Sequence, residues 1–267
     1  MTEKPDFLET AHGTRIAYHR VADKGDKGSR RPGVIFLGGF MSDMEGSKAL
    51  ALEAWCRAED YAFVRFDYMG HGRSSGRFDG GTISKWLADA LAVIDQLSEG
   101  PQILVGSSMG GWLALLAARE LPERVAGLVG IAAAPDFTKR HWDELSAKDR
   151  QTIIREGRLL VASDYGPDPY VFTRDLFEDG ADNCLLDKSY PHEFPVRLIQ
   201  GTDDPDVPWQ TATDLAAVMT GGDCEILLVP GGDHRLSEPA DLKRLIRVVG
   251  ELAAAPTRAL PDHIESV

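Results

Sequence analysis

Short runs of apolar residues alternate along the chain with longer segments in which apolar residues recur every three or four positions. The short runs are bounded by glycine or proline, which is typical of strands buried on both faces of a parallel sheet. Strands are expected at residues 34–37, 62–66, 102–105, 125–131, 196–199 and 225–229. Two earlier segments, 7–8 and 16–18, predict an antiparallel start to the sheet.

The clearest helical periodicity lies in residues 82–98, where apolar side chains form a single stripe. The stripe consists of Ile83, Trp86, Leu87, Ala90, Leu91, Ile94 and Leu97. Further helices are expected at residues 50–58, 112–121, 211–219 and 242–252. Because strands and helices alternate, the expected fold class is α/β, with a mostly parallel sheet and helices on both of its faces.

Residues 135–195, here called the lid segment, interrupt this alternation. The lid segment is rich in charged and aromatic residues, and its periodic parts predict helices. A loop of this length without regular structure is uncommon in a compact domain. We therefore expect residues 1–267 to form a single domain, with 135–195 as a small helical lid inserted after the strand at 125–131.

Composition and charge narrow the possible partners. Hydrophobic residues make up 43% of the chain, enough for a large core, and the net charge is −13. That charge disfavours binding to nucleic acid or to an anionic membrane surface. The three cysteines form no CxxC pair, and no apolar run approaches the roughly 20 residues that cross a bilayer. With a polar start at residues 1–6, these features predict a cytoplasmic protein without a membrane span.

The strongest local signal is Gly106-Ser107-Ser108-Met109-Gly110, between an expected strand and an expected helix. This Gly-x-Ser-x-Gly pattern is typical of a nucleophile elbow, a tight turn that exposes a serine hydroxyl over a helix N-terminus. Only Ser108 has glycine at both flanking offsets, so Ser108 is the candidate nucleophile. The structural alternative is a glycine-rich turn with incidental serines.

A serine hydroxyl needs a base within hydrogen-bond reach to become nucleophilic near neutral pH. With such an elbow, the acid and then the histidine follow the serine in the chain. The histidines after Ser108 are His141, His192, His234 and His263. His234 lies immediately beyond the last expected strand, where a loop can reach the elbow, so His234 is the candidate base.

The acid should follow the strand at 196–199, where Asp203, Asp204 and Asp206 compete. Asp204 fits the spacing Gly-x-x-Asp-x-x-Val-Pro and is the candidate; the other two remain alternatives. A buried carboxylate there fixes the tautomer of the imidazole and stabilises the imidazolium. This cluster lacks the later glycine and terminal glutamate of a calcium loop, so no metal site is expected.

Acyl transfer also needs donors for the oxyanion. The backbone N–H groups of Met109, after the nucleophile, and of Phe40, after Gly38-Gly39, are the candidates. His71 lies between two glycines ahead of Ser108 in the chain, and we interpret it as a structural residue.

With these residues in place, the chain resembles a known family over nearly its full length. The stretches that carry the resemblance are residues 67–76, 106–112, 204–209 and 232–235. They are similar to the α/β-hydrolase-domain family that includes a mitochondrial palmitoyl-protein thioesterase also known to cleave acyl glucuronides. The resemblance implies an α/β-hydrolase fold, no cofactor, and a catalytic triad at Ser108, Asp204 and His234.

We therefore expect a serine hydrolase that cleaves carboxylic esters or acyl thioesters of a small-molecule or acylated substrate through an acyl-enzyme. The alternatives are a non-catalytic ligand-binding relative, or a lipase, peptidase or C–C bond hydrolase of the same fold. Four aromatic residues are candidates for an acyl pocket, or equally for a small core of the lid segment. They are Trp142, Tyr170, Phe172 and Trp209.

Overall fold

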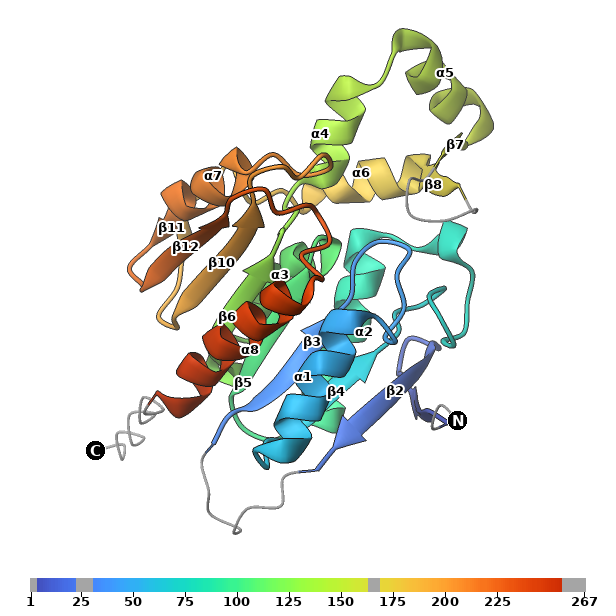
Figure 1. The fold of residues 1–267 in the computed structure, drawn as a ribbon. Coiled ribbons are helices and arrows are strands. Elements are labelled where there is room, and N and C mark those ends of the chain that lie inside the picture. Colours follow the sequence, from blue (N-terminus) through green and yellow to red (C-terminus); the bar gives the residue numbers. More distant parts are fainter. Residues whose placement is uncertain (1–3, 23–30, 163–168, 256–267) are drawn as a thin grey trace, which may run out of the picture.

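A central eight-stranded sheet organises the molecule (Figure 1). The computed structural model describes residues 4–22, 31–162 and 169–255. In spatial order the strands are β1 (Asp6–Glu9), β2 (Arg15–Val21), β4 (Phe63–Phe66), β3 (Gly33–Leu37), β5 (Gln102–Ser107), β6 (Val125–Ile131), β10 (Val196–Gly201) and β12 (Cys224–Val229). The β1–β2 and β2–β4 pairs are antiparallel, and the other pairs are parallel. The predicted mostly parallel sheet, with its antiparallel start, is confirmed.

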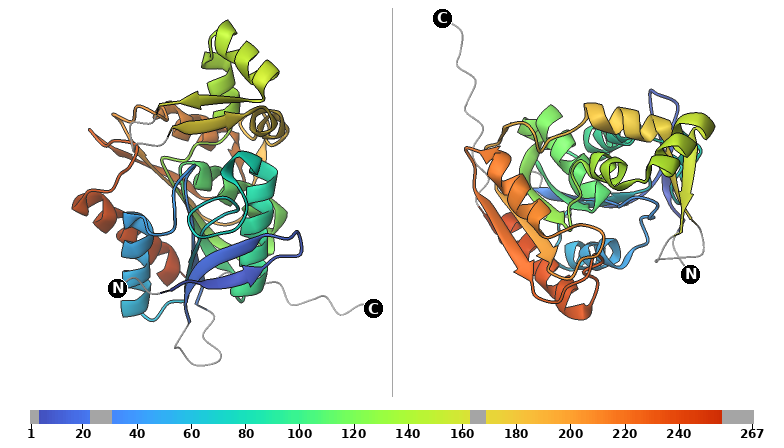
Figure 2. Two further views of the ribbon diagram at one scale, coloured as in Figure 1. Left: turned by 90° about the vertical axis from the view of Figure 1, so that its right-hand side faces the viewer. Right: turned by 90° about the horizontal axis from the view of Figure 1, so that it is seen from above.

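Helices cover both faces of this sheet (Figure 2). Apolar residues of α2 (Ile83–Leu97), α3 (Met109–Glu120) and α7 (Gln210–Val218) belong to one buried cluster. Those of α1 (Ser47–Ala58) and α8 (Pro239–Ala254) belong to a second. Two 3-10 turns, Phe78–Gly80 and Pro122–Arg124, lie in the connections.

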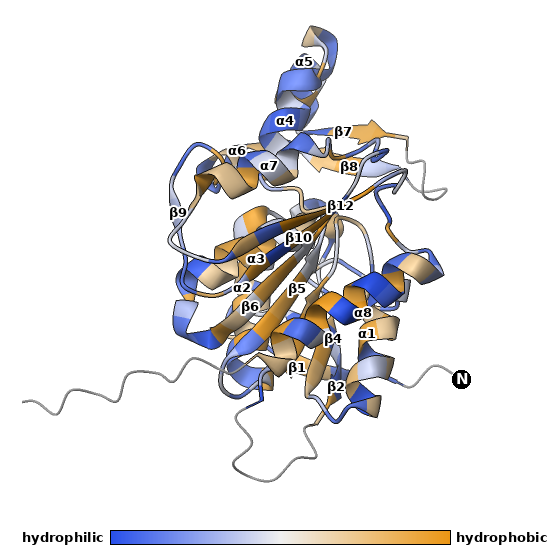
Figure 3. Ribbon diagram, turned by 60° about the vertical axis from the view of Figure 1, so that its left-hand side comes forward, coloured by the Kyte–Doolittle hydropathy of each residue, from blue (hydrophilic) through white to orange (hydrophobic). Residues whose placement is uncertain are grey.

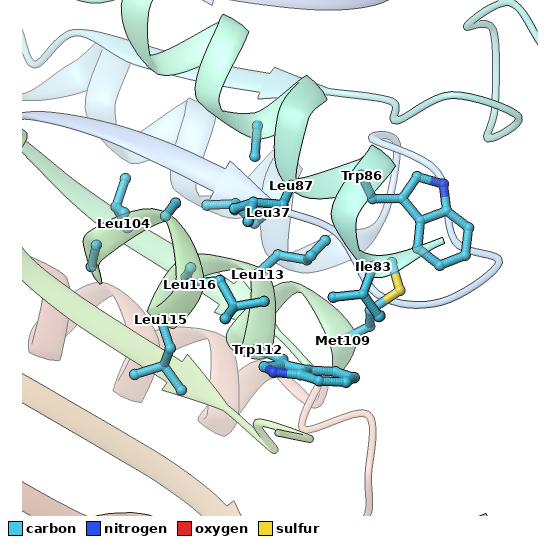
Figure 4. Packing of buried hydrophobic residues seen from close by; sticks show 14 of the residues in the cluster. Leu37, Ile83, Trp86, Leu87, Leu104, Met109, Trp112, Leu113, Leu115 and Leu116 are labelled. Atoms are coloured by element: carbon cyan, nitrogen blue, oxygen red, sulfur yellow. The ribbon is translucent and has the colours of Figure 1, made fainter. Parts of the chain in front are cut away.

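The packing of α2 follows from its sequence. Thr82 caps its N-terminus by accepting a hydrogen bond from the Lys85 N–H, and the predicted stripe is buried except for Leu91. Figure 4 shows Ile83, Trp86 and Leu87 of this stripe beside α3. Helix α2 thereby packs against α3 in the same buried cluster. The N-cap of α3 is Ser108, the candidate nucleophile.

The lid segment contains α4 (Phe137–Glu144), α5 (Ala147–Glu156) and α6 (Arg174–Asp182), and projects beyond the sheet (Figure 1). It also contains an antiparallel pair of strands, β7 (Arg158–Val161) and β8 (Tyr170–Thr173), which the sequence pattern did not predict. No residue of β7 is fully buried, so it lacks the alternation that identifies a strand. A further short pair joins β9 (Tyr190–Pro191) to β11 (Met219–Thr220).

Hydropathy differs between the sheet and the lid segment. Figure 3 shows mostly hydrophobic central strands, whereas α4 and α5 are mostly hydrophilic. Among the residues that the model describes, no helix is both long and apolar enough to cross a membrane. Because β3, β5, β6, β10 and β12 are parallel, the loops that follow them gather at one edge of the sheet, on the side of the lid segment.

Candidate active site

The backbone of Ser108 is strained. Its φ of 54° and ψ of −120° lie in a region that L-residues rarely adopt. Hydrogen bonds hold it there: the Ser108 N–H donates to the Ile131 carbonyl at 2.9 Å, and its carbonyl accepts from the N–H groups of Gly111 and Ala134. The turn thus presents the Ser108 side chain at the N-terminus of α3.

The two motif glycines are required by close backbone contacts. A Cβ atom at Gly106 would lie 2.2 Å from the Gly110 carbonyl oxygen, and one at Gly110 would lie 2.1 Å from that of Leu37. Neither neighbour is a flexible side chain that can move aside. The pattern read from the sequence therefore reflects how tightly the elbow packs against the end of β3.

The structure brings the three candidate catalytic residues into one hydrogen-bonded chain. His234 Nε2 lies 3.0 Å from Ser108 Oγ, and His234 Nδ1 lies 2.9 Å from Asp204 Oδ2. Both distances are within normal hydrogen-bond range. The side chain of Asp204 is fully buried, whereas that of His234 is 14% exposed. Of these two side chains, only the imidazole of His234 lines the cavity above Ser108.

Three further groups fix the Asp204 carboxylate. Its Oδ1 accepts hydrogen bonds from the N–H groups of Asp206 and Val207, and its Oδ2 accepts one from Gln200 Nε2 at 2.9 Å. Burial alone would raise the pKa of Asp204, but hydrogen bonding and charge attraction from His234, with the two N–H groups, lower it below its ordinary value. Sequence reasoning missed Gln200, whose signal was a polar residue ending an apolar strand.

The competing residues make other contacts. Asp203 Oδ1 accepts a hydrogen bond from the Thr202 hydroxyl. Asp233, the residue before His234 in the sequence, accepts one from the Leu236 N–H through its Oδ1. His192 is buried with its Nδ1 2.8 Å from the Phe194 carbonyl oxygen, and His141 packs its ring on Phe172. His263 lies outside the described residues.

Asp204, Asp206 and His234 offer ligand atoms within 4.8 Å of one another, a spacing that can hold a metal ion. Both carboxylate oxygens of Asp204 already accept hydrogen bonds, one of them from His234 itself. A cation would have to replace these bonds, so the donor set fits an oriented imidazole better than a metal.

The loop after β3 lies directly against the candidate nucleophile. A Cβ atom at Gly39 would lie 3.5 Å from Ser108 Cβ, and Phe40 and Met109 line the same cavity as Ser108. Met109 is the first residue of α3, so its N–H has no partner within the helix. Both candidate donors therefore lie at the cavity that contains Ser108.

Two buried residues that sequence reasoning missed hold the far end of this loop. Asp67 Oδ1 accepts a hydrogen bond from the Met44 N–H at 2.7 Å, and Arg65 Nη1 donates to the Met44 carbonyl at 3.1 Å. Asp67 is 2% exposed and Arg65 is 5% exposed. The peptide groups of Met44 are therefore fixed from both sides by the end of β4.

A cavity of about 440 Å³ opens above Ser108 and His234. Of the four candidate substrate contacts, Tyr170 and Phe172 line it and Trp142 and Trp209 do not. The Trp142 ring instead packs 5.2 Å from that of Phe177 within the lid segment, and Trp209 is 37% exposed. Sequence reasoning did not place other residues in the cavity wall, and these include Phe137, His141, Lys48 and Arg235.

Comparisons with known proteins show the family and the fold. Residues 34–246 match the model of the alpha/beta hydrolase family. The chain is 37% identical to the mitochondrial palmitoyl-protein thioesterase ABHD10 of Bos taurus over 92% of this chain and 79% of that protein. The mouse ABHD10 structure superposes with a TM-score of 0.85 and 37% identity, covering 94% of this chain and 98% of that one. A crystal structure from Agrobacterium vitis superposes with a TM-score of 0.88 and 39% identity, with the same coverage.

Proposed function

Because the chain belongs to the alpha/beta hydrolase family, we propose that it is a serine hydrolase of acyl thioesters or carboxylic esters, with Ser108, His234 and Asp204 as its triad. The observation that carries the proposal is the continuous hydrogen-bonded chain from Ser108 through His234 to buried Asp204, at the base of a cavity. A non-catalytic relative would have no need to preserve a strained serine in register with an oriented imidazole.

In the acylation step, Ser108 Oγ attacks the carbonyl carbon of the substrate while His234 Nε2 takes the hydroxyl proton. The carbonyl oxygen becomes an oxyanion, for which the N–H groups of Phe40 and Met109 are the proposed donors. Asp204 stabilises the imidazolium. The tetrahedral intermediate then collapses, the C–S or C–O bond breaks, and the imidazolium gives its proton to the departing thiolate or alkoxide.

In the deacylation step, His234 takes a proton from water, which attacks the acyl-enzyme carbonyl. Collapse of the second intermediate breaks the bond to Ser108 Oγ, which recovers its proton from His234. The products are the free carboxylic acid and the serine hydroxyl. No cofactor enters either step.

The acyl substrate class rests on two further observations. ABHD10 of Bos taurus is named as a palmitoyl-protein thioesterase. The cavity above Ser108 has aromatic walls from Phe40, Phe137, Tyr170 and Phe172, which suit an apolar acyl group. We also propose that the lid segment serves as the cover of this cavity, because Phe137, Tyr170 and Phe172 all belong to it.

The substrate class is tested with paired thioesters and oxyesters of increasing acyl length, from acetyl to palmitoyl. We expect turnover that depends on acyl length in the native chain and at most about 10⁻³ of it in Ser108→Ala, since the nucleophile is removed. Hydrolysis of peptide or C–C substrates, with acyl esters and thioesters left intact, would contradict the proposal.

We propose a cytoplasmic location, supported by the three cysteines, none of which is in a disulfide. The ABHD10 relatives are named as mitochondrial proteins. Fractionation of cells that make the chain tests this directly, and recovery in an organelle fraction would contradict it.

A further inference from the structure

Phe40 joins two parts of the molecule. Its N–H is the proposed oxyanion donor, and its half-buried ring lies among other aromatic rings. Phe78 and Trp86, which belong to the body of the domain, lie with their ring centroids 4.9 and 5.9 Å from that of Phe40. These distances are typical of favourable aromatic pairs.

The rest of the Phe40 ring is covered by the lid segment. Phe172, Phe137 and Tyr170 lie with their ring centroids 5.3, 5.5 and 5.8 Å from that of Phe40. Tyr170 and Phe172 are two residues apart on β8, so both side chains leave the same face of that strand. The lid segment therefore supplies more than half of the ring contacts to Phe40.

The peptide group that carries the Phe40 N–H is also held by Ser42, because the Gly39 carbonyl accepts hydrogen bonds from the N–H and the Oγ of Ser42 at 3.2 and 2.8 Å. Gly38 and Gly39 precede Phe40 without side chains, and Met41 follows with a φ of 54°, a strained value for a non-glycine residue. The position of the Phe40 N–H thus depends on the Ser42 hydrogen bonds and on the packing of the Phe40 side chain. A shift of the ring moves its own N–H group, because both are attached to one Cα atom.

We propose that Phe172 is a positioning residue for the reaction, which holds the Phe40 N–H at the oxyanion site by stacking on the Phe40 ring. The inference rests on the proposed function. Phe172 is 5% exposed, and its ring makes an angle of 15° with the Phe40 ring. The lid segment then contributes to the rate of the chemical step as well as to the walls of the cavity.

The simpler alternative is that Phe172 only touches the acyl chain, since it also lines the cavity. The two accounts differ for a substrate too small to reach Phe172. With p-nitrophenyl acetate, a wall residue has no effect, whereas a residue that positions the oxyanion donor lowers the rate for every acyl length.

Phe177 provides the matched control. Its ring stacks on that of Phe172, with the centroids 5.9 Å apart, and also contacts Trp142, so it belongs to the same aromatic cluster. Phe177 does not line the cavity. A Phe177→Leu change removes the same volume from the lid segment, with no direct stacking on Phe40 lost.

The experiment measures kcat and KM for p-nitrophenyl acetate in the native chain, Phe172→Leu, Phe172→Tyr and Phe177→Leu, together with the Tm of each. We expect Phe172→Leu to lower kcat and kcat/KM equally, by about 10-fold, because a small misplacement of one donor weakens an interaction made in the transition state. Phe172→Tyr keeps the ring and should restore kcat to within about 3-fold of the native value, and Phe177→Leu should change kcat less than about 2-fold.

Two results would overturn the inference but leave the proposed function intact. One is a native kcat of Phe172→Leu on the acetate ester, and the other is an equal loss of kcat in Phe172→Leu and Phe177→Leu. A loss in Phe172→Leu that appears only as a raised KM for long acyl chains would assign Phe172 to the wall of the cavity and also overturn it. A native chain without any ester or thioester turnover would instead overturn the proposed function, and the inference with it.

Discussion

Replacing Asp204 with asparagine is expected to lower kcat by about 10⁴-fold while the protein remains folded. The Asp204 carboxylate accepts the hydrogen bond from His234 Nδ1 at 2.9 Å, which leaves Nε2 free to take the proton of Ser108. An amide NH₂ group in that place would favour the opposite tautomer, and it would not stabilise the imidazolium. The measurement is kcat on an acyl ester, with Tm as the check on folding.

The neighbouring aspartates are the controls, because the sequence alone left them as alternatives. Asp203→Asn and Asp206→Asn should each change kcat by less than about 5-fold. The carboxylate that lies 2.9 Å from His234 Nδ1 is that of Asp204. A large loss in either control, with Asp204→Asn close to native, would assign the acid to the other residue.

The protein should lose stability as the pH falls from about 6.5 to about 4, in part through His71. Burial lowers the pKa of His71 to about 4, despite the hydrogen bond between its Nδ1 and the Met69 carbonyl. The residue is 3% exposed, and its ring lies among Tyr68, Phe78 and Trp86. An imidazolium in this apolar surrounding is strongly disfavoured.

The direction of this change in stability with pH follows from proton binding to His71. Between pH 6.5 and 4 the unfolded chain binds a proton at His71 and the folded chain does not, so the free energy of unfolding rises with pH in this range. Urea titrations at pH 7.5 and 4.5 should show that the free energy of unfolding of the native chain falls by roughly 2 to 3 kcal/mol more than that of His71→Phe. Parallel pH dependence in the two proteins would contradict this account, whatever their absolute stabilities.

The sheet was predictable because its strands are buried on both faces. Where helices cover both faces of a sheet, its strands need continuous apolar runs, and such runs can be recognised in the sequences of β3 and β5. Helix α2 was predictable because one face of it packs on the sheet and the rest meets solvent. The hairpin of β7 and β8 was missed because β7 is largely exposed and leaves no such pattern.

At the candidate site, the predictable residues were those fixed by local geometry. The elbow needs glycine at positions 106 and 110 because backbone atoms meet there at close range, and this requirement singles out Ser108. Arg65 and Asp67 were missed because their roles depend on contacts with Met44, in a different segment of the chain. Gln200 lies only four residues before Asp204, but a polar residue at the end of an apolar strand does not show by itself which group it contacts. Trp142 and Trp209 show the same limit, since an aromatic residue serves a cavity wall and a small core equally well in sequence.

The most direct test of the account is covalent labelling with a fluorophosphonate, which reacts with a serine hydroxyl only when an oriented base activates it. We expect one label per chain, located on Ser108 by peptide mass mapping, and labelling slowed by at least about 10²-fold in folded His234→Ala. A folded chain that hydrolyses acyl substrates yet remains unlabelled, or that carries the label on another residue, would contradict the assignment of Ser108 as the nucleophile.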